Sequence, residues 1–144
     1  MKGLDIIIPV HKYNDEVQTL LKRCLTSIKD MATQNGGKFD IDVHVVGPNT
    51  LPSDEILDLV EYTLQVHENT GELDFASQVN FAVSNICKHD YFMIVEFDDM
   101  VTPKWLNMVM PYMEERPKCS VFLPLVEVYD IKNPSVPLHY INEI

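Results

Sequence analysis

The chain has 144 residues, of which 46% are hydrophobic and 23% are charged, so it is long enough for one globular domain with one core. Its 11 Lys and Arg residues against 22 Asp and Glu residues leave a net charge of −11. This charge excludes general affinity for nucleic acid or anionic membranes, because both repel an acidic surface that has no basic patch.

The first half of the chain predicts strands alternating with helices. Residues 4–10 form an apolar run that is rich in isoleucine and interrupted only by Asp5, which is typical of a strand buried on both faces. Apolar residues then recur at helical spacing from Val17 to Met31, and Asn14 is the expected N-cap. Residues 41–46 predict a second strand before a turn. This β-α-β order favours a parallel strand pair.

The middle of the chain continues the alternation. Ser53 is the expected cap of a short helix whose apolar side extends to Leu64, and a weak strand follows near residues 65–68. Another helix begins at Leu73 or Asp74, because apolar residues follow at spacings of three or four. Residues 91–97 predict the next strand, which their composition marks as buried.

A last helix and strand are expected near the end. Thr102 and Pro103 are typical of an N-cap and a first helical residue, and this helix should run to about Glu115 with a kink or an early stop at Pro111. Residues 120–129 predict a strand.

Three prolines of the carboxyl-terminal region, Pro124, Pro134 and Pro137, affect the prediction of its structure. Pro124 favours an edge position or a bulge for the last strand. Beyond it, the prolines among residues 133–137 predict an extended and poorly anchored tail. We therefore expect one domain over residues 1–130 and a tail over residues 131–144.

These elements together predict an α/β protein with a mostly parallel sheet and helices on both faces. Ligands of such sheets bind beyond the carboxyl ends of the strands. Cys24, Cys87 and Cys119 are odd in number and widely spaced, so neither a disulfide framework nor a zinc site is indicated. The apolar run at the start is too short for a signal peptide or a membrane span, and we expect a cytoplasmic protein.

Three carboxylates lie at the end of the strand predicted at residues 91–97 or directly after it: Glu96, Asp98 and Asp99. Carboxylate oxygens are suitable ligands for Mg²⁺ or Mn²⁺, and such an ion is commonly completed by phosphates of a substrate. The alternative is that these residues only cap the next helix electrostatically, and the local sequence leaves both interpretations open.

Five segments in order resemble glycosyltransferases of family 2, which have the GT-A fold: LDIIIPVH, LLKRCLTSI, NTGELDFASQVNFAV, HDYFMIVEFDD and TPKWL. Each segment is short, and their common order makes the resemblance specific. It covers about residues 4–127 and implies a Rossmann-like domain that binds a nucleoside diphosphate sugar. The resemblance also implies that the chain stops before the acceptor-binding half of such enzymes.

The resemblance assigns roles to individual residues. Pro9 and His11 would lie against the nucleotide base, Asn80 would lie on a helix next to the nucleotide, and Glu96 would face the ribose or the diphosphate. Asp98 would bind the nucleotide through Mn²⁺ or Mg²⁺. The implied metal ligands are Asp98, Glu96 and Asp99. No residue is assigned as the catalytic base, because the family supplies it from the acceptor half.

Two positions depart from the family pattern. The second strand of family members ends in an acidic segment that meets the base, whereas residues 46–50 here read Val-Gly-Pro-Asn-Thr. Glu96 stands where an aspartate is usual, and its longer side chain changes the approach to the ribose or metal.

Three functions remain open. The first is inverting transfer from a nucleoside diphosphate sugar to an unknown acceptor, with another chain or segment supplying the acceptor site. The second is a catalytically inactive module that serves as a structural or interaction subunit with a protein partner or in an oligomer. A nucleotidyltransferase is disfavoured, because residues 9–14 lack the glycine-rich basic loop of such enzymes.

Overall fold

The computed structural model describes residues 2–60, 64–116, 118, 121–122, 126–130 and 132–141. The chain forms two compact units, Met1–Met108 and Val109–Ile144, which are described one at a time. Among the described residues, the first unit contains a four-stranded sheet and the second a two-stranded one.

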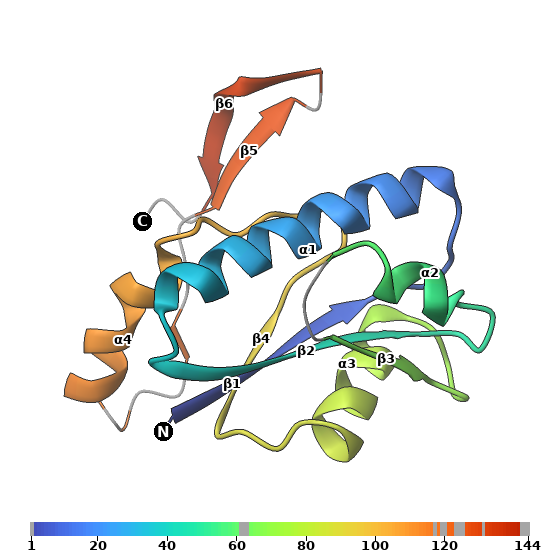
Figure 1. Cartoon of the computed structure of the whole chain (residues 1–144), viewed down its shortest axis with the longest axis horizontal. Coiled ribbons are helices and arrows are strands. Elements are labelled where there is room, and N and C mark those ends of the chain that lie inside the picture. The colour runs from blue at the N-terminus through green and yellow to red at the C-terminus, as the bar shows by residue number, and fades with distance from the viewer. Residues whose placement is uncertain are drawn as a thin grey trace. The chain divides into compact units, whose positions relative to one another are not determined.

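The sheet of the first unit is parallel throughout, as predicted, with the strand order β3-β2-β1-β4 (Figure 1). Its strands are β1 (Lys2–Pro9), β2 (Phe39–Gly47), β3 (Gln65–Glu68) and β4 (Tyr91–Ile94). The central strand β1 carries Ile6, Ile7 and Ile8, whose exposure is zero. A strand covered on both faces needs apolar residues at successive positions, which explains this run.

Helices connect the strands, and their ends follow from local sequence. The helices are α1 (Asp15–Asn35), α2 (Ser53–Leu57), α3 (Phe75–Asn85) and α4 (Trp105–Glu115). Asn14 caps α1 by accepting a hydrogen bond from the backbone N–H of Val17 at 2.9 Å, as predicted. Asp74 caps α3 in the same way through Ser77, at 3.0 Å.

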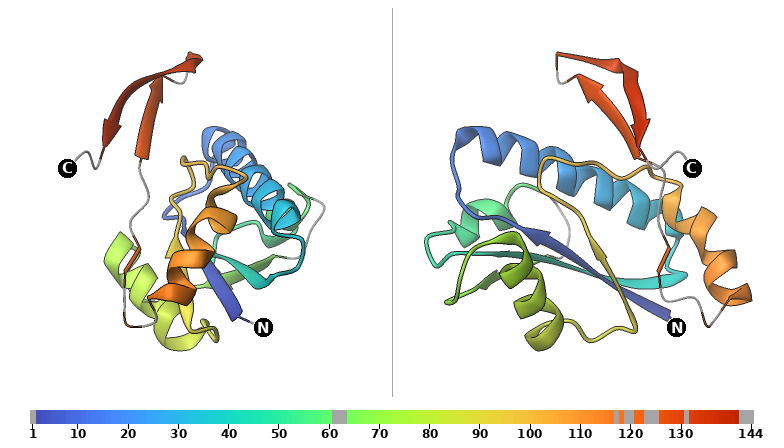
Figure 2. Two further views of the ribbon diagram at one scale, coloured as in Figure 1. Left: turned by 90° about the vertical axis from the view of Figure 1, so that its left-hand side faces the viewer. Right: turned by 180° about the vertical axis from the view of Figure 1, so that it is seen from behind.

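The helices α1 and α3 lie on opposite faces of the sheet (Figure 2). Ile7 and Val46 pack against Ala82 of α3. Since side chains alternate along a strand, the neighbours of Ile7 point to the other face, where α1 lies. The predicted α/β fold with helices on both faces is therefore confirmed.

The strand predicted at residues 91–97 differs from the structure in its end and its burial. It ends at Ile94, and it is not buried: Phe92 and Ile94 are 49% and 38% exposed. Its position is the reason, because β4 is an edge strand among the described residues.

Two helices begin or end differently from the prediction. Ser53 is the first residue of α2 rather than its cap, and this helix ends at Leu57, well before Leu64. The fourth helix begins at Trp105 because the segment after Thr102 first forms a turn, in which Trp105 N donates to Thr102 O at 3.1 Å. Pro111 lies inside this helix, which continues to Glu115.

The described part of the second unit contains an antiparallel hairpin of β5 (Val126–Asp130) and β6 (Asn133–Ile141). The predicted strand at 120–129 thus begins later, and its Ser120 and Pro124 lie outside the described residues. The segment predicted as a poorly anchored tail forms β6 instead. Register shifts on either side of Tyr129, which faces Pro137, accommodate the missing N–H groups of the prolines. The hairpin joins residues from both sides of the predicted 130/131 boundary.

A buried polar network runs across the sheet of the first unit and starts from Asp5 on β1, whose exposure is zero. One Asp5 oxygen accepts hydrogen bonds from the backbone N–H groups of Lys88 and His89, at 2.9 and 2.8 Å. Its other oxygen lies 2.7 Å from Nε2 of His44 on β2. Burial alone would raise the pKa of Asp5, but the N–H of His89, the His44 side chain and the N–H of Lys88 leave it lowered.

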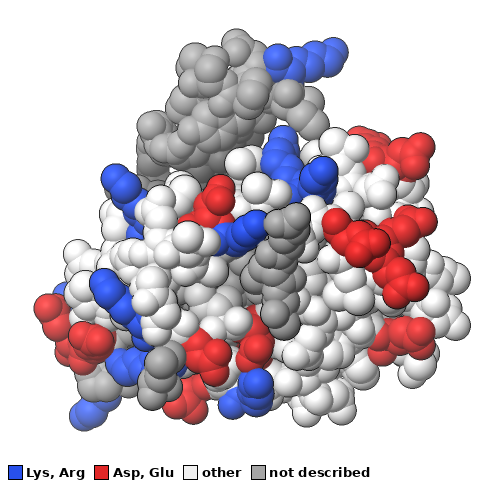
Figure 3. All heavy atoms as spheres, viewed as in Figure 1, with Lys and Arg blue, Asp and Glu red and all other residues white. Residues whose placement is uncertain are grey.

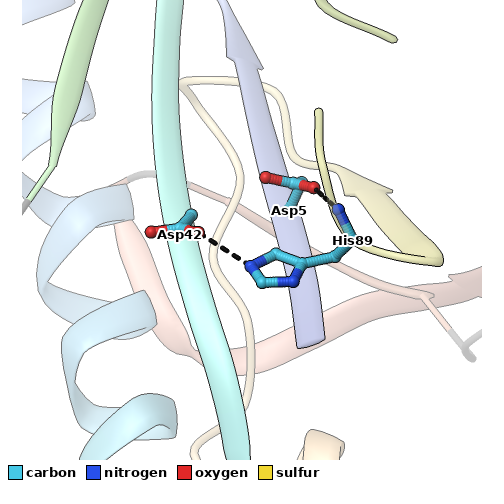
Figure 4. A group of neighbouring side chains, drawn as sticks. All are labelled: Asp5, Asp42 and His89. Atoms are coloured by element: carbon cyan, nitrogen blue, oxygen red, sulfur yellow. Dashed lines mark hydrogen bonds and ion pairs between the residues drawn. The ribbon is translucent and has the colours of Figure 1, made fainter. Parts of the chain in front are cut away.

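The network extends on both sides of Asp5. On one side, Nδ1 of His44 lies 3.1 Å from Nε2 of His67 on β3. On the other, the ring of His89 points toward Asp42, with Nε2 2.7 Å from the carboxylate (Figure 4). Gly3 is required here, because the His89 ring occupies the space of a Cβ at that position. The network therefore connects β3, β2, β1 and the segment directly before β4.

We predict that Asp5→Asn lowers the free energy of unfolding by roughly 3 kcal/mol at pH 7, because removing one partner of a buried ionic network leaves its other members unsatisfied. Urea denaturation measures this change. The exposed Asp58→Asn serves as the matched control and should change stability by less than about 0.5 kcal/mol. Equal, small losses in both variants would refute a stabilising role for Asp5.

We predict that His67 makes the fold sensitive to mild acid. Burial, followed by the charge of His44, lowers the pKa of His67 below its ordinary value of about 6.5. The folded state therefore disfavours the proton, so stability falls as the pH drops below about 6.5. Urea midpoints at pH 7.5 and 5.5 should differ less for His67→Gln than for the wild type. The control His11→Gln changes an exposed histidine, and its urea midpoints at the two pH values should differ as much as those of the wild type. A difference of the same size in His67→Gln would contradict the prediction.

Candidate functional site

The carboxyl ends of the central strands meet at one edge of the sheet. Val10 N donates to Val46 O at 2.8 Å, and Val95 N donates to Ile7 O at 3.0 Å, so the pairing continues one residue past β1 and β4. The chain then turns at residues 96–99, where Asp99 N donates to Glu96 O at 3.0 Å. This turn presents the predicted carboxylates beyond the end of β4.

A hollow of about 460 Å³ lies at this edge, within the size range of small-molecule sites. Its lining comes from the end of β1, the start of α3 and the turn after β4. The lining residues are Pro9, His11, Leu73, Asp74, Phe75, Gln78, Glu96, Phe97 and Asp98.

The carboxylates of Glu96, Asp98 and Asp99 are exposed, and one oxygen from each lies within 4.8 Å of the others. Burial raises the pKa of Glu96, and the charges of Asp99 and Asp98 raise it further. The pKa of Asp99 is also raised, by burial and by Asp98, with Arg23 acting in the opposite direction. Within the described ranges, no salt bridge involves these three side chains. The cluster is therefore self-repelling and accessible, which suits a divalent cation.

Helix α1 holds the backbone of this turn. Arg23 donates from Nη2 to Asp98 O at 3.0 Å, and the Cys24 thiol lies 3.7 Å from Glu96 O. Ser27 accepts a hydrogen bond from Val101 N at 3.1 Å. These contacts use backbone groups of the turn and leave its carboxylates available. Burial raises the pKa of Cys24 to about 12, so this thiol acts as a structural group rather than a nucleophile.

Four of the predicted site residues share the hollow: Pro9, His11, Glu96 and Asp98. Asp99 belongs to the same acidic turn but does not line the hollow. Asn80 is exposed on α3 and is also not a lining residue.

The start of α3 forms a wall of the hollow whose residues were not among the predicted site residues. Leu73, Asp74, Phe75 and Gln78 line it, and Phe97 lies with its ring centroid 6.4 Å from that of His11. A signal for this wall was present, because Asp74 marks the start of a helix directly after the end of β3. The carboxyl end of a strand and the start of the next helix face the ligand edge of a parallel sheet.

A second group of possible metal ligands consists of Asp5, Asp42 and His89. Its oxygens already have partners, because Asp42 also pairs with Nζ of Lys88 at 3.0 Å and Asp5 accepts the two backbone bonds described above. This group therefore acts as part of the structural network.

The face of the first unit shown in Figure 3 has no continuous basic surface of the kind that binds nucleic acid. On the face shown in Figure 3, the Lys and Arg side chains of the first unit lie among Asp and Glu side chains rather than in one basic patch. Among the helices that the structure describes, none combines the length and apolar composition needed to cross a bilayer.

The fold has a counterpart among solved structures. The crystal structure of S. aureus TarS 1–349 is similar, with a TM-score of 0.60 and 17% sequence identity over 81% of this chain. The match covers 33% of the TarS chain, so this chain spans about a third of that neighbour's length. At this identity, the similarity shows a shared GT-A, Rossmann-like fold, as the sequence resemblance implied. A comparison with curated proteins finds no match.

The sequence itself matches a family profile described as Glycosyl transferase family 2. The match spans residues 5–141, which includes the hairpin and all of the five segments on which the resemblance rested except Leu4, the first residue of the first segment. On this match, the chain belongs to glycosyl transferase family 2.

Proposed function

We propose that this glycosyltransferase-like domain binds a nucleoside diphosphate sugar, with Asp98, Glu96 and Asp99 binding Mn²⁺ or Mg²⁺ next to the diphosphate. The observation that carries the proposal is the accessible acidic turn at the border of the hollow, with its ligand oxygens within 4.8 Å of one another. Three carboxylate oxygens fit a hard divalent cation, which such sites commonly complete with phosphate oxygens and water.

The charge of the chain supports a requirement for a cation. A diphosphate approaching three carboxylates on a protein of net charge −11 is strongly repelled unless a positive ion lies between them. When bound, the ion would hold the diphosphate and offset the negative charge that develops as the bond to the sugar breaks.

The other residues of the hollow would position the nucleotide. We propose that Pro9 and His11 lie against the base and that Glu96 faces the ribose or the diphosphate. Asn80 stays a prediction of the family resemblance, as a neighbour of the nucleotide on α3.

The proposed reaction is an inverting sugar transfer. The acceptor hydroxyl attacks the anomeric carbon from the face opposite the diphosphate, loses its proton to a general base, and the nucleoside diphosphate leaves. We propose that the acceptor site and the base come from another segment or another chain, since this chain spans only about a third of the length of TarS 1–349. We also propose a cytoplasmic location, because Cys24 and Cys87 are free thiols and reducing compartments maintain this state.

The proposal predicts that a nucleoside diphosphate binds in the presence of Mn²⁺ and that Asp98→Ala weakens this binding at least about tenfold, since a charged ligand is lost from the ion. Isothermal titration calorimetry with UDP, TDP, GDP, ADP and CDP, with and without Mn²⁺, measures it.

The matched control for this experiment is Asp58→Ala, which removes an exposed carboxylate at the end of α2 and should bind as the wild type does. The proposal fails if no nucleotide binds to the wild type, or if Asp98→Ala and the wild type bind equally well.

A catalytically inactive interaction module is the second candidate. The exposed apolar side chains of Phe92 and Ile94 on the edge strand β4 favour it, because exposed apolar residues at a strand edge are typical of protein contacts. This candidate predicts a stable oligomer that Phe92→Ser with Ile94→Ser dissociates, and a melting temperature that nucleotide and Mn²⁺ leave unchanged. Light scattering that shows a monomer, together with stabilisation by nucleotide and Mn²⁺, would rule it out.

A further inference from the structure

Gln78 is one of the residues that line the hollow, and the acceptor oxygen of its side-chain amide has no partner. Its side chain is only 1% exposed, and Nε2 donates to Leu73 O at 2.8 Å. This bond defines the orientation of the amide, because the opposite orientation would place two oxygens against each other. Oε1 is therefore the free atom, and it is buried without any hydrogen-bond partner.

A buried acceptor without a partner is costly, and native structures usually satisfy such an atom with a ligand or an ordered water. Gln78 is a lining residue of the hollow, so a ligand bound there would contact it. Nε2 of Gln78 already donates to Leu73 O. The side chain can therefore offer a ligand only its uncharged acceptor, Oε1, and no N–H donor.

An exposed aromatic ring lies on the same wall. Phe75, one helical turn before Gln78, is 48% exposed and also lines the hollow. Aromatic faces that remain open to solvent bind nucleobases by stacking. An acceptor and a stacking surface together fit a flat heterocycle that carries an N–H group.

The part of the hollow formed by the turn after β4 suits the charged part of a nucleotide. Glu96 and Asp98 line the hollow from this turn, and a cation bound to them would attract the diphosphate. At the end of β2, where the family has an acidic segment that meets the base, Gly47 is buried against Leu51 and Val10 O, with no room for a side chain. The base therefore needs a recognition group from another element.

We propose that Gln78 is the residue that recognises the nucleobase: its Oε1 accepts a hydrogen bond from a ring N–H of the base while Phe75 stacks on the base. This inference rests on the proposed nucleotide binding. Because the proposed donor is a ring N–H, it favours uracil, thymine or guanine, which carry one on their pairing edge, over cytosine and adenine, whose N–H donors there belong to exocyclic amino groups.

The test compares UDP and GDP with their N-methylated forms, 3-methyluridine diphosphate and 1-methylguanosine diphosphate, by calorimetry on the full chain with Mn²⁺. For whichever nucleotide binds, methylation should weaken binding to the wild type about tenfold, because it removes the donor. This comparison changes only the ligand, so it does not depend on the folding of a variant.

A variant completes the thermodynamic cycle. Gln78→Met has a similar volume and lacks the acceptor, so it should bind the unmethylated nucleotide about tenfold more weakly and no longer distinguish it from the methylated form. Gln65→Met, at an exposed position of β3, is the matched control and should behave as the wild type does. Phe75→Leu should weaken both forms by a similar factor of about tenfold.

The outcomes separate this inference from the proposed function. If no nucleotide binds to the wild type, the proposed function fails and this inference fails with it. If UDP or GDP binds but its methylated form binds equally well, only the role of Gln78 is overturned. Better binding of CDP or ADP than of UDP and GDP, or a complex in which a water satisfies Oε1, would also overturn it.

Discussion

The buried carboxylate of Asp5 is the interaction on which the sheet depends. An ionised group at the centre of a sheet is tolerated only when it is fully hydrogen-bonded, and Asp5 receives three such bonds from the segment before β4 and from β2. These bonds are specific for one alignment of the strands, since a slip by one residue would turn each side chain to the other face. Register at the amino ends in turn determines which residues emerge at the carboxyl ends, where the hollow lies.

Two groups of acidic residues in the first unit have pKa values shifted in opposite directions. In the network, donors from the protein itself surround the carboxylates and lower the pKa values of Asp5 and Asp42. In the turn after β4, α1 contacts backbone oxygens, and the pKa values of Glu96 and Asp99 are raised. The same residue types are thus structural where the protein supplies the counter-groups and open to a ligand where it does not.

The sequence predicted the parts of the fold that depend on local patterns. The isoleucine run of β1, the cap Asn14, the helix start at Leu73 or Asp74 and the helical spacing that follows identified their elements correctly. The prediction of burial was wrong for β4, because burial depends on the position of a strand in the sheet. An apolar strand has the same sequence pattern at an edge as in the centre. Gln78 was also missed, since the helical pattern of α3 gives a glutamine no sign that its amide is buried beside a hollow.

The proposed function implies that the binding of the cation and the binding of the nucleotide depend on each other. Carboxylates that remain hydrated gain little from binding a cation alone, and a diphosphate alone meets the repulsion of Glu96 and Asp98. With both bound, phosphate oxygens would complete the coordination of the ion, and the ion would remove the repulsion. Such coupling is reciprocal, so each ligand would raise the affinity for the other by the same factor. On this proposal, a chain this acidic binds a strongly anionic donor because the cation and the diphosphate neutralise each other.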